Sequence, residues 1–165
     1  MPAPAFILGT RPEIIKLAPI IDILTSRKLP FQLIHTGQHF SHNMSQIFLK
    51  ELHLPSKIRF LNIGAGTPFK QLTKSILGLE KLFLDTPPSA VIVEGDTNTV
   101  LAGAIAASKL NIPIVHVEAG LRSNDFRMPE EYNRRVTDHL STLLLAPSPT
   151  TPAPSARSMS PARSS

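Results

Sequence analysis

Carboxylates follow several short apolar segments of this chain, in places where they could take part in proton transfer. Asp96 comes shortly after the apolar run at residues 90–93, and Glu118 directly follows the run at residues 114–117. Glu130 opens a later segment with helical spacing. Burying a carboxylate at the end of a strand is costly unless it has a partner or a task, and a positioned carboxyl group can act as a general acid or base. These three residues are therefore the candidate catalytic groups.

Basic side chains accompany these carboxylates. Thr10 and Glu13 match a capping box at the start of a predicted helix, but this pattern leaves Arg11 unexplained. A guanidinium group is unfavourable at the amino terminus of a helix unless an anion lies nearby. Lys16 follows about one turn later, and Arg122 is either an ion-pair partner of the carboxylate that precedes it or a ligand for the same anion. Arg11, Lys16 and Arg122 are therefore the candidate substrate-binding residues.

Local structure accounts for some of these residues but not for all of them. Asp96 could cap the helix that follows, yet Thr97 and Asn98 could cap it equally well, so the Asp96 side chain is available for another role. Strand alternation predicts that His116 and Glu118 point to the same face of the sheet. On local grounds, Asp96 and Glu118 are the carboxylates that most need an explanation.

Two histidines lie four residues apart in the segment that holds Gly37, Gln38 and His39. That spacing brings metal ligands together on a helix but not across a glycine turn, and the chain has neither cysteine nor an HExxH pattern. We therefore expect hydrogen bonding to a polar ligand here rather than a metal site. The glycines at residues 64–66 lack the third glycine of a dinucleotide-binding loop, so no such site is expected either.

Short β-branched runs alternate with longer helical stretches along most of the chain. This alternation predicts an α/β fold, a Rossmann-like doubly wound parallel sheet covered by helices on both faces. Strands are predicted at residues 6–8, 31–36, 58–63, 90–93, 114–117 and 142–145, and helices at 12–27, 43–53, 68–84, 98–110 and 130–140. Because ligands bind at the carboxyl ends of such strands, the candidates from separate loops should converge on one rim and bind a phosphate-bearing or similar anion.

Bulk composition narrows the class of protein. Hydrophobic residues make up 42% of the chain and charged residues 18%, which is ordinary for a soluble globular domain. The absence of cysteine excludes disulfides and thiolate metal sites, and no apolar run approaches the roughly 20 residues that span a bilayer. The net charge of +5 is scattered and forms no basic stripe with aromatic residues, so no nucleic-acid partner is expected. We expect a cytoplasmic protein with no membrane partner.

The composition changes abruptly after Leu145. Residues 147–165 are rich in proline, serine, alanine and threonine and contain no Leu, Ile, Val or Phe. Such a segment cannot bury enough apolar surface to offset its chain entropy. We therefore predict one domain at residues 1–146 and a disordered tail at residues 147–165. A frameshift or a truncation would explain why the strand–helix pattern stops there.

Several segments, in order along the chain, resemble the signatures of the non-hydrolysing UDP-N-acetylglucosamine 2-epimerase family. The resemblance covers about residues 6–148, and its most specific part is the block HVEAGLR followed by MPEE and NR. The matching segments are residues 9–13 with Lys16, 36–39, 95–97, 116–122, 129–131 and 133–134.

The resemblance implies a GT-B architecture of two Rossmann-like domains, of which this chain is the amino-terminal half. In the family, UDP is eliminated across C1 and C2 of UDP-N-acetylglucosamine to give 2-acetamidoglucal. UDP then adds back with the opposite configuration at C2, which yields UDP-N-acetylmannosamine. The resemblance further implies no metal or redox cofactor, UDP-N-acetylglucosamine and UDP as ligands, and a homodimer for the full-length protein. The second domain of the family is absent from residues 1–165, so we expect the chain alone to be inactive.

The resemblance also implies roles for individual residues. Asp96, Glu118 and Glu130 fall on the catalytic carboxylates of the family, while Arg11 and Lys16 fall on positions that line its cleft. Gln38 and His39 fall in a segment that forms an activating site for a second UDP-N-acetylglucosamine in bacterial members. Which carboxylate is the base stays open at this point. So do three alternatives: a hydrolysing 2-epimerase, a GT-B glycosyltransferase, and a non-catalytic dimerising or binding module.

Overall fold

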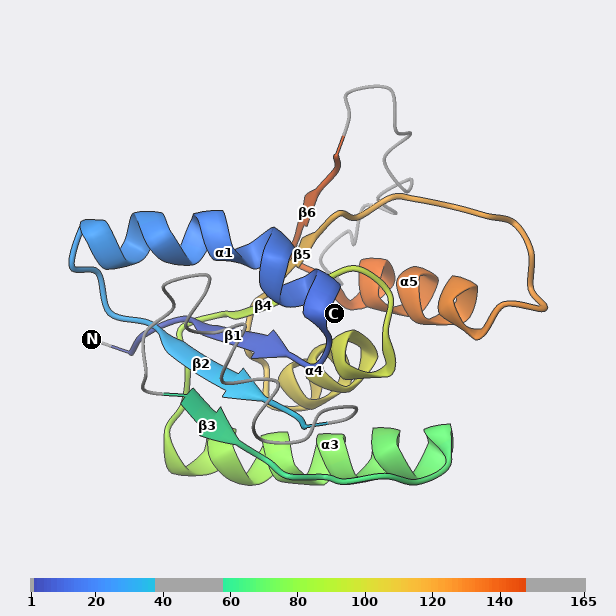
Figure 1. Ribbon diagram of the computed structural model, residues 1–165, viewed down its shortest axis with the longest axis horizontal. Coiled ribbons are helices and arrows are strands. Elements are labelled where there is room, and N and C mark those ends of the chain that lie inside the picture. The colour runs from blue at the N-terminus through green and yellow to red at the C-terminus, as the bar shows by residue number, and fades with distance from the viewer. Residues whose placement is uncertain (1, 38–57, 148–165) are drawn as a thin grey trace, which may run out of the picture.

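Six parallel strands form one sheet in the computed structural model, which describes residues 2–37 and 58–147 (Figure 1). The strands are β1 (Ala5–Leu8), β2 (Gln32–His35), β3 (Ile58–Phe60), β4 (Val91–Glu94), β5 (Ile114–Val117) and β6 (Leu143–Leu145). Their order across the sheet is β3-β2-β1-β4-β5-β6, and every neighbouring pair is parallel. This order reverses direction between β1 and β4, as in a doubly wound Rossmann-like sheet.

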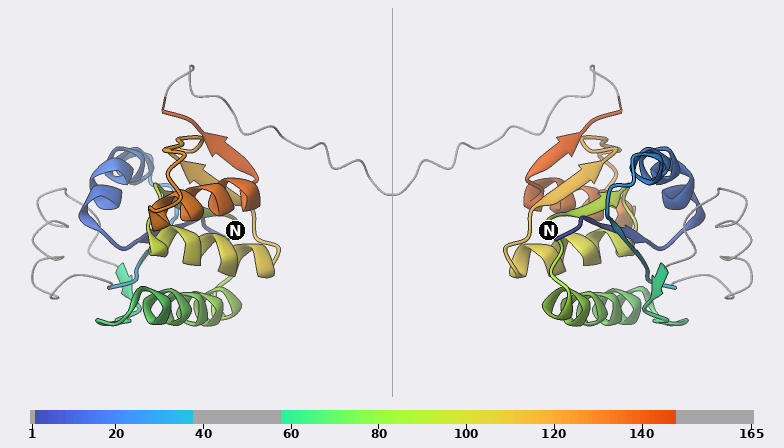
Figure 2. Two further views of the ribbon diagram at one scale, coloured as in Figure 1. Left: turned by 90° about the vertical axis from the view of Figure 1, so that its right-hand side faces the viewer. Right: turned by 90° about the vertical axis from the view of Figure 1, so that its left-hand side faces the viewer.

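Helices cover both faces of this sheet. They are α1 (Arg11–Ser26), α3 (Pro68–Asp85), α4 (Asn98–Lys109) and α5 (Pro129–Leu140). Figure 2 shows α1 on one side of the sheet and the other three helices on the opposite side. The buried apolar residues divide in the same way, because one cluster joins the sheet to α1 and the other joins it to α3 and α4. The predicted α/β doubly wound fold is therefore confirmed.

The central strands are apolar throughout because both of their faces are covered. In β1, Ala5 and Ile7 pack toward α3 and α4, whereas Phe6 and Leu8 pack toward α1. Helix α4 approaches the sheet unusually closely: a Cβ atom added at Gly103 would lie 2.9 Å from the side chain of Val93. Small residues along α4 therefore set the distance between this helix and the sheet.

The predicted elements that fall within the described residues agree with the structure in type and order, and their ends differ by at most three residues. The largest difference concerns β3, which ends at Phe60 instead of residue 63. Asn62 and Gly64 have left-handed backbones, with φ of 50° and 69°, and such residues end the regular alternation of a strand. The predicted helix at residues 43–53 and residues 148–165 of the predicted tail lie outside the described residues. Within residues 2–37 and 58–147, no helix is long and apolar enough to cross a membrane.

Gly9 follows β1 and lies against two buried threonine side chains. A Cβ atom at this position would lie 2.1 Å from Oγ1 of Thr99 and 2.9 Å from Oγ1 of Thr36. The two hydroxyl groups are hydrogen-bonded to each other at 3.0 Å, so neither can move without losing its partner. Glycine is therefore required here by the close approach of the loop after β1 to the start of α4.

Replacing Gly9 with alanine should destabilise the domain, because the added methyl group displaces Thr99 or Thr36. Overpacking of a well-packed site typically costs ~1–3 kcal/mol. In urea unfolding of the chain, Gly9→Ala should lower the transition midpoint. Gly66→Ala is the matched control, because its Cβ would lie at an ordinary 3.5 Å from Cβ of Lys70. Equal midpoints for the two variants would contradict the steric role of Gly9.

Candidate active site

A cavity of about 180 Å³ lies where the strand order of the sheet reverses. The loop after β1 and the loop after β4 lead to helices on opposite faces of the sheet, so they separate and leave a crevice at the carboxyl ends of the strands. The charged and hydrogen-bonding groups that line the cavity are Thr10, Glu13, Lys16, Glu94, Asp96, Thr97, Glu118 and Arg134.

Glu13 connects the two loops beneath this cavity. Its carboxylate accepts hydrogen bonds from the backbone N–H of Gly9 at 2.5 Å and of Thr10 at 3.1 Å, as the capping box predicts. It also accepts a hydrogen bond from the hydroxyl group of Thr97 at 2.6 Å, across the crevice. Burial raises the pKa of Glu13, and the hydrogen bonds from Thr97 and the backbone oppose that rise. Glu13 is therefore a structural residue that fixes the floor of the site.

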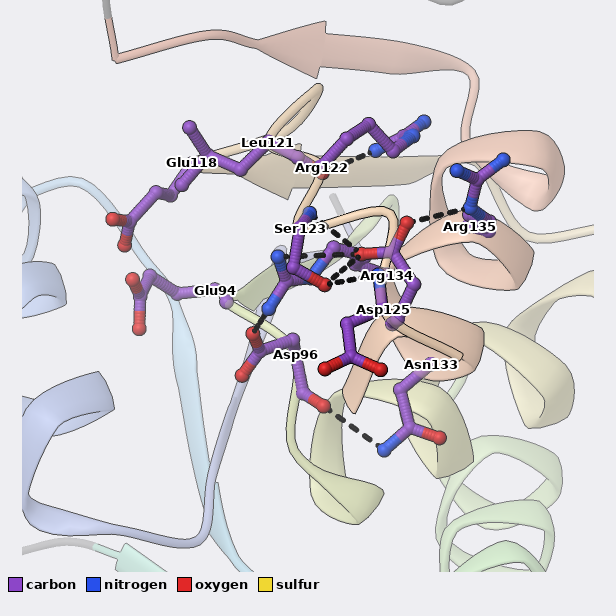
Figure 3. A network of polar contacts seen from close by, with 12 residues as sticks. Glu94, Asp96, Glu118, Leu121, Arg122, Ser123, Asp125, Asn133, Arg134 and Arg135 are labelled. Carbon is purple, nitrogen blue, oxygen red and sulfur yellow. Dashed lines mark hydrogen bonds and ion pairs between the residues drawn. The ribbon is translucent and has the colours of Figure 1, made fainter. Parts of the chain in front are cut away.

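Asp96 is held by α5. Nη2 of Arg134 lies 2.5 Å from Oδ2 of Asp96, and the side-chain amide of Asn133 donates to the Asp96 carbonyl at 2.9 Å (Figure 3). The N-cap of α4 is Thr97, whose hydroxyl group accepts from the N–H of Val100. The capping role is therefore filled by Thr97, and the Asp96 carboxylate belongs to the cavity.

Lys16 joins two carboxylates on the other side of the cavity. Its ammonium group donates a hydrogen bond to Glu118 and lies 3.3 Å from Oε1 of Glu94. Figure 3 shows the carboxyl groups of Glu94 and Glu118 pointing into the same space. Burial, and then the hydrogen bond with Glu118, raise the pKa of Glu94 to about 8. The hydrogen bond from Glu94, with Lys16 in support, holds the pKa of Glu118 below its usual value.

The backbone at Glu118 departs from the strand that precedes it. Its φ of 63° lies in the left-handed region, which is strained for a residue with a side chain. The Glu118 side chain therefore reaches Lys16 on the α1 side of the sheet, while His116 contacts Asp138 on the α5 side. The prediction that His116 and Glu118 share a face is wrong, because strand alternation ends at Glu118.

Asp138 of α5 anchors the turn that contains Glu118. One of its carboxylate oxygens lies 2.6 Å from Nδ1 of His116. The other accepts from the N–H of Gly120 at 3.1 Å and lies 2.6 Å from Nη2 of Arg122. Burial would raise the pKa of Asp138, but the hydrogen bonds from His116 and Arg122 outweigh it and lower the pKa. Arg122 pairs with Asp138 and not with Glu118, the partner that the sequence suggested, and its substrate-binding role remains a prediction.

A second buried carboxylate of α5 holds the segment that follows this turn. Glu131 accepts hydrogen bonds from the backbone N–H and the hydroxyl group of Ser123, and from Nε of Arg135. Burial would raise the pKa of Glu131, yet these hydrogen bonds lower it to about 2. Glu131 therefore stays ionised at any ordinary pH and ties the loop to α5.

The structure brings together some of the predicted site residues and separates others. Asp96, Glu118 and Lys16 line the same cavity, at the reversal of the sheet. Arg11 and Glu130 are exposed in the first turns of α1 and α5, and neither is among the residues that line it. Gln38 and His39 lie outside the described residues. The catalytic and binding roles of all these residues remain predictions.

Sequence patterns missed Glu94, Arg134 and Asp138 as members of the site. A signal for Glu94 was present, because it is the carboxylate that directly ends an otherwise apolar strand. Glu131 and Asp138 are seven residues apart and so share one face of α5, but a polar helix face is normally solvated. No local pattern distinguishes a buried polar face from an exposed one.

Comparisons with known proteins point to one family. A family model described as UDP-N-acetylglucosamine 2-epimerase matches residues 22–154. The UDP-N-acetylglucosamine 2-epimerase of Methanocaldococcus jannaschii is 56% identical over 143 residues, which cover 87% of this chain and 39% of the relative. The UDP-2,3-diacetamido-2,3-dideoxy-D-glucuronate 2-epimerase of Pseudomonas aeruginosa is 45% identical over 142 residues, which cover 86% and 40%. The chain thus spans about 40% of the length of these relatives.

Solved structures agree with this result. The Methanocaldococcus jannaschii UDP-GlcNAc 2-epimerase in complex with UDP-GlcNAc and UDP matches with a TM-score of 0.84 and 55% identity, over 88% of this chain and 40% of that one. MurG of Acinetobacter baumannii, at 15% identity and a TM-score of 0.65, shares the fold alone. The sheet therefore corresponds to one Rossmann-like domain of a GT-B architecture.

Replacing Asp138 with asparagine should destabilise the turn at residues 118–122. The amide has one acceptor oxygen for three donors, and its NH₂ group would face one of them. Breaking a buried charged pair by changing one partner typically costs about 3 kcal/mol or more. We expect a lower urea midpoint and faster hydrogen exchange at the N–H of Gly120. Asp125→Asn is the control, since the ion-pair partner of Asp125 among the described residues is the exposed Arg127, and losing such a surface pair should matter little. Equal effects of the two substitutions would argue against an anchoring role for Asp138.

Proposed function

The chain belongs to the UDP-N-acetylglucosamine 2-epimerase family, and we propose that it forms the acid–base half of an active site that interconverts UDP-N-acetylglucosamine and UDP-N-acetylmannosamine. The observation that carries this proposal is the cavity at the reversal of the sheet, which is lined by Asp96 and Glu118 from separate loops and by Lys16 from α1. A relative that is 55% identical has been solved in complex with UDP-GlcNAc and UDP.

The proposed reaction makes two demands that such a cavity suits. Inversion at C2 requires a proton to leave one face of the sugar and another to arrive on the opposite face, so two proton-transfer groups in different positions are useful. Asp96 follows β4 and Glu118 follows β5, which places the two carboxyl groups on different walls. We assign the proton transfers at C2 to this pair, without dividing removal and delivery between them.

The second demand is stabilisation of negative charge when the C1–O bond breaks and UDP departs. Cations held near the leaving group lower that barrier. Lys16 lies in the cavity wall, and Arg11 is exposed at the amino terminus of α1, where helix N–H groups also attract anions. We propose that these two residues face the diphosphate. Arg122 acts through Asp138 by holding the turn of Glu118, and Glu130 is the third carboxylate of the proposed site, on its outer edge.

The size of the cavity bears on how much of a nucleotide sugar these residues enclose. Sites that bury a drug-sized ligand typically measure about 300–1,000 Å³. The cavity at the sheet reversal measures about 180 Å³, which is below this range. We therefore propose that catalysis also requires the part of the relatives that lies outside this match.

This proposal can be tested by joining residues 1–146 to the remainder of the 56% identical Methanocaldococcus jannaschii relative. The joined protein should interconvert the two nucleotide sugars, followed by NMR, whereas residues 1–165 alone should not. Asp96→Asn and Glu118→Gln should each lower kcat/KM by ~10²–10⁴-fold, the usual contribution of one general acid or base. Glu80→Gln, at an exposed position on α3, serves as the control and should leave kcat/KM unchanged.

The products separate this proposal from its alternatives. UDP-N-acetylmannosamine with UDP still attached supports the proposed reaction. Free N-acetylmannosamine and released UDP would identify a hydrolysing enzyme, and sugar transfer to an added acceptor would identify a glycosyltransferase. Faster turnover of UDP-2,3-diacetamido-2,3-dideoxy-D-glucuronate would indicate the substrate named for the Pseudomonas aeruginosa relative. Turnover by residues 1–165 at the rate of the joined protein would overturn the need for further residues.

A further inference from the structure

His116 is a buried histidine that the proposed reaction does not use. Its side chain is 1% exposed, and both of its ring nitrogens have polar partners. Nδ1 lies 2.6 Å from Oδ1 of Asp138 on α5, and Nε2 lies 2.7 Å from the backbone carbonyl oxygen of Gly95. This imidazole ring on β5 therefore connects α5 to the loop after β4.

Both partners of this ring can only accept hydrogen bonds. A carbonyl oxygen carries no proton, and Asp138 is an acceptor in its ionised form. The other oxygen of Asp138 favours that form, because it lies 2.6 Å from Nη2 of Arg122 and accepts from the N–H of Gly120. A neutral imidazole has one N–H, so either tautomer would turn a nitrogen lone pair toward an oxygen lone pair at hydrogen-bond distance. Both contacts are satisfied together only when each ring nitrogen carries a proton.

The charges around the ring compensate its own charge. In the described part of the chain, Asp138 faces the ring from α5, and Glu118 and Arg122 follow it after β5. The neighbours of the ring across the sheet, Val93 on β4 and Leu144 on β6, are apolar. Arg122 is paired with Asp138 and its side chain is 21% exposed, so the ion pair and water both weaken its repulsion of the ring. A buried charge needs a partner of opposite sign, and the Asp138 carboxylate supplies it.

The contact with Gly95 fixes the backbone next to Asp96. Gly95 has a left-handed backbone with φ of 84°, which glycine adopts freely, so an outside contact is needed to hold the peptide group between these two residues. Nε2 of His116 supplies that contact at the Gly95 carbonyl, and Asn133 donates to the carbonyl of Asp96 itself. The peptide groups on both sides of the Asp96 Cα atom are thus held in place.

The contact with Asp138 supports the turn that contains Glu118. The left-handed backbone of Glu118, with φ of 63°, persists only where the surroundings hold it. The proton on Nδ1 of His116 keeps the Asp138 carboxylate in the position where it accepts from the N–H of Gly120. One ring therefore contacts the supports of both carboxylates in the proposed site.

We propose that His116 is a charged positioning residue that, with a proton on each ring nitrogen, ties the loop of Asp96 to the turn of Glu118. This inference rests on the proposed function only in giving those two carboxylates a catalytic role. His116 is not among the residues that line the cavity, so it acts through its contacts with Gly95 and Asp138.

The charge of the ring can be observed directly by NMR of the 165-residue chain with ¹⁵N-labelled histidine. At about pH 7.5, where a histidine in water is mostly neutral, the spectrum should show an N–H group at both ring nitrogens of His116. These signals can be assigned through couplings to the backbone of the same residue, so the measurement needs no substitution. One ring nitrogen without a proton at this pH would overturn the proposal.

Two substitutions separate the two contacts of the ring. In His116→Asn the NH₂ group can take the place of Nδ1–H and still donate to Asp138, whereas in His116→Gln it can take the place of Nε2–H and still donate to Gly95. The N–H of Gly95, which donates to the carbonyl of Val117 at 3.1 Å, reports on one contact, and the N–H of Gly120 reports on the other. Hydrogen exchange should become ~10-fold faster at Gly95 in His116→Asn and at Gly120 in His116→Gln.

The exposed His139 near the end of α5 provides the matched control. His139→Gln should change hydrogen exchange at neither Gly95 nor Gly120. Equal exchange rates of the two His116 variants at both glycines would show that His116 only fills space. If neither variant folds, the protons on the wild-type ring decide the question.

The positioning role can be measured in the protein that joins residues 1–146 to the remainder of the Methanocaldococcus jannaschii relative. Both His116 variants should lower kcat by ~10²-fold, the effect of a small misplacement of catalytic groups, and should leave KM within about twofold of its original value. An unchanged kcat in variants whose hydrogen exchange has changed as expected would overturn the positioning role. If the joined protein has no activity, the epimerase proposal fails, whereas the ring protons and the exchange rates still decide whether His116 ties the two loops together.

Discussion

The buried carboxylate of Glu13 holds together the two loops between which the cavity opens. It receives two backbone N–H groups from the loop after β1 and the Thr97 hydroxyl group from the loop after β4. Gly9 makes this possible, because the lack of a Cβ atom lets the first loop lie against Thr99. The two loops lead to helices on opposite faces of the sheet, and without such a tie they would separate further. Because this connection fixes both loops, it also fixes where Lys16 on α1 and Asp96 after β4 lie.

The other wall of the site depends on a strained backbone that buried charges hold in place. Glu118 adopts a left-handed backbone conformation, which is unfavourable for a residue with a side chain unless its surroundings hold it. Asp138 binds the turn just after it through Gly120 and Arg122, and Glu131 binds the segment that follows through Ser123. Helix α5 thus offers a buried polar face where most helices offer an apolar one. That face turns Glu118 out of the strand direction and toward Lys16.

The sequence predicts the frame of this site better than its contacts. Continuous apolar runs predicted all six strands, and the parallel order that follows from them predicted that Asp96 and Glu118 lie near each other. The capping box predicted the role of Glu13 within its own helix, but not its bond to Thr97. The contacts that the sequence did not predict join residues far apart in the chain. The bond from Lys16 to Glu118 joins residues 102 positions apart, and it depends on a backbone angle at Glu118 that no local pattern encodes.

The tie between Glu13 and Thr97 also bears on the order in which the chain folds. These residues are 84 positions apart, and β1 meets β4 through only two residue pairs, Ala5 with Val91 and Phe6 with Ile92. Contacts at such separation form after a long loop has closed, which is slow compared with the local pairing of β4 with β5. We therefore expect the cavity to be completed late, when the two halves of the sheet join along that short seam. A small molecule held in the cavity would bind only chains in which this seam has closed, and would draw the folding equilibrium of the whole domain toward them.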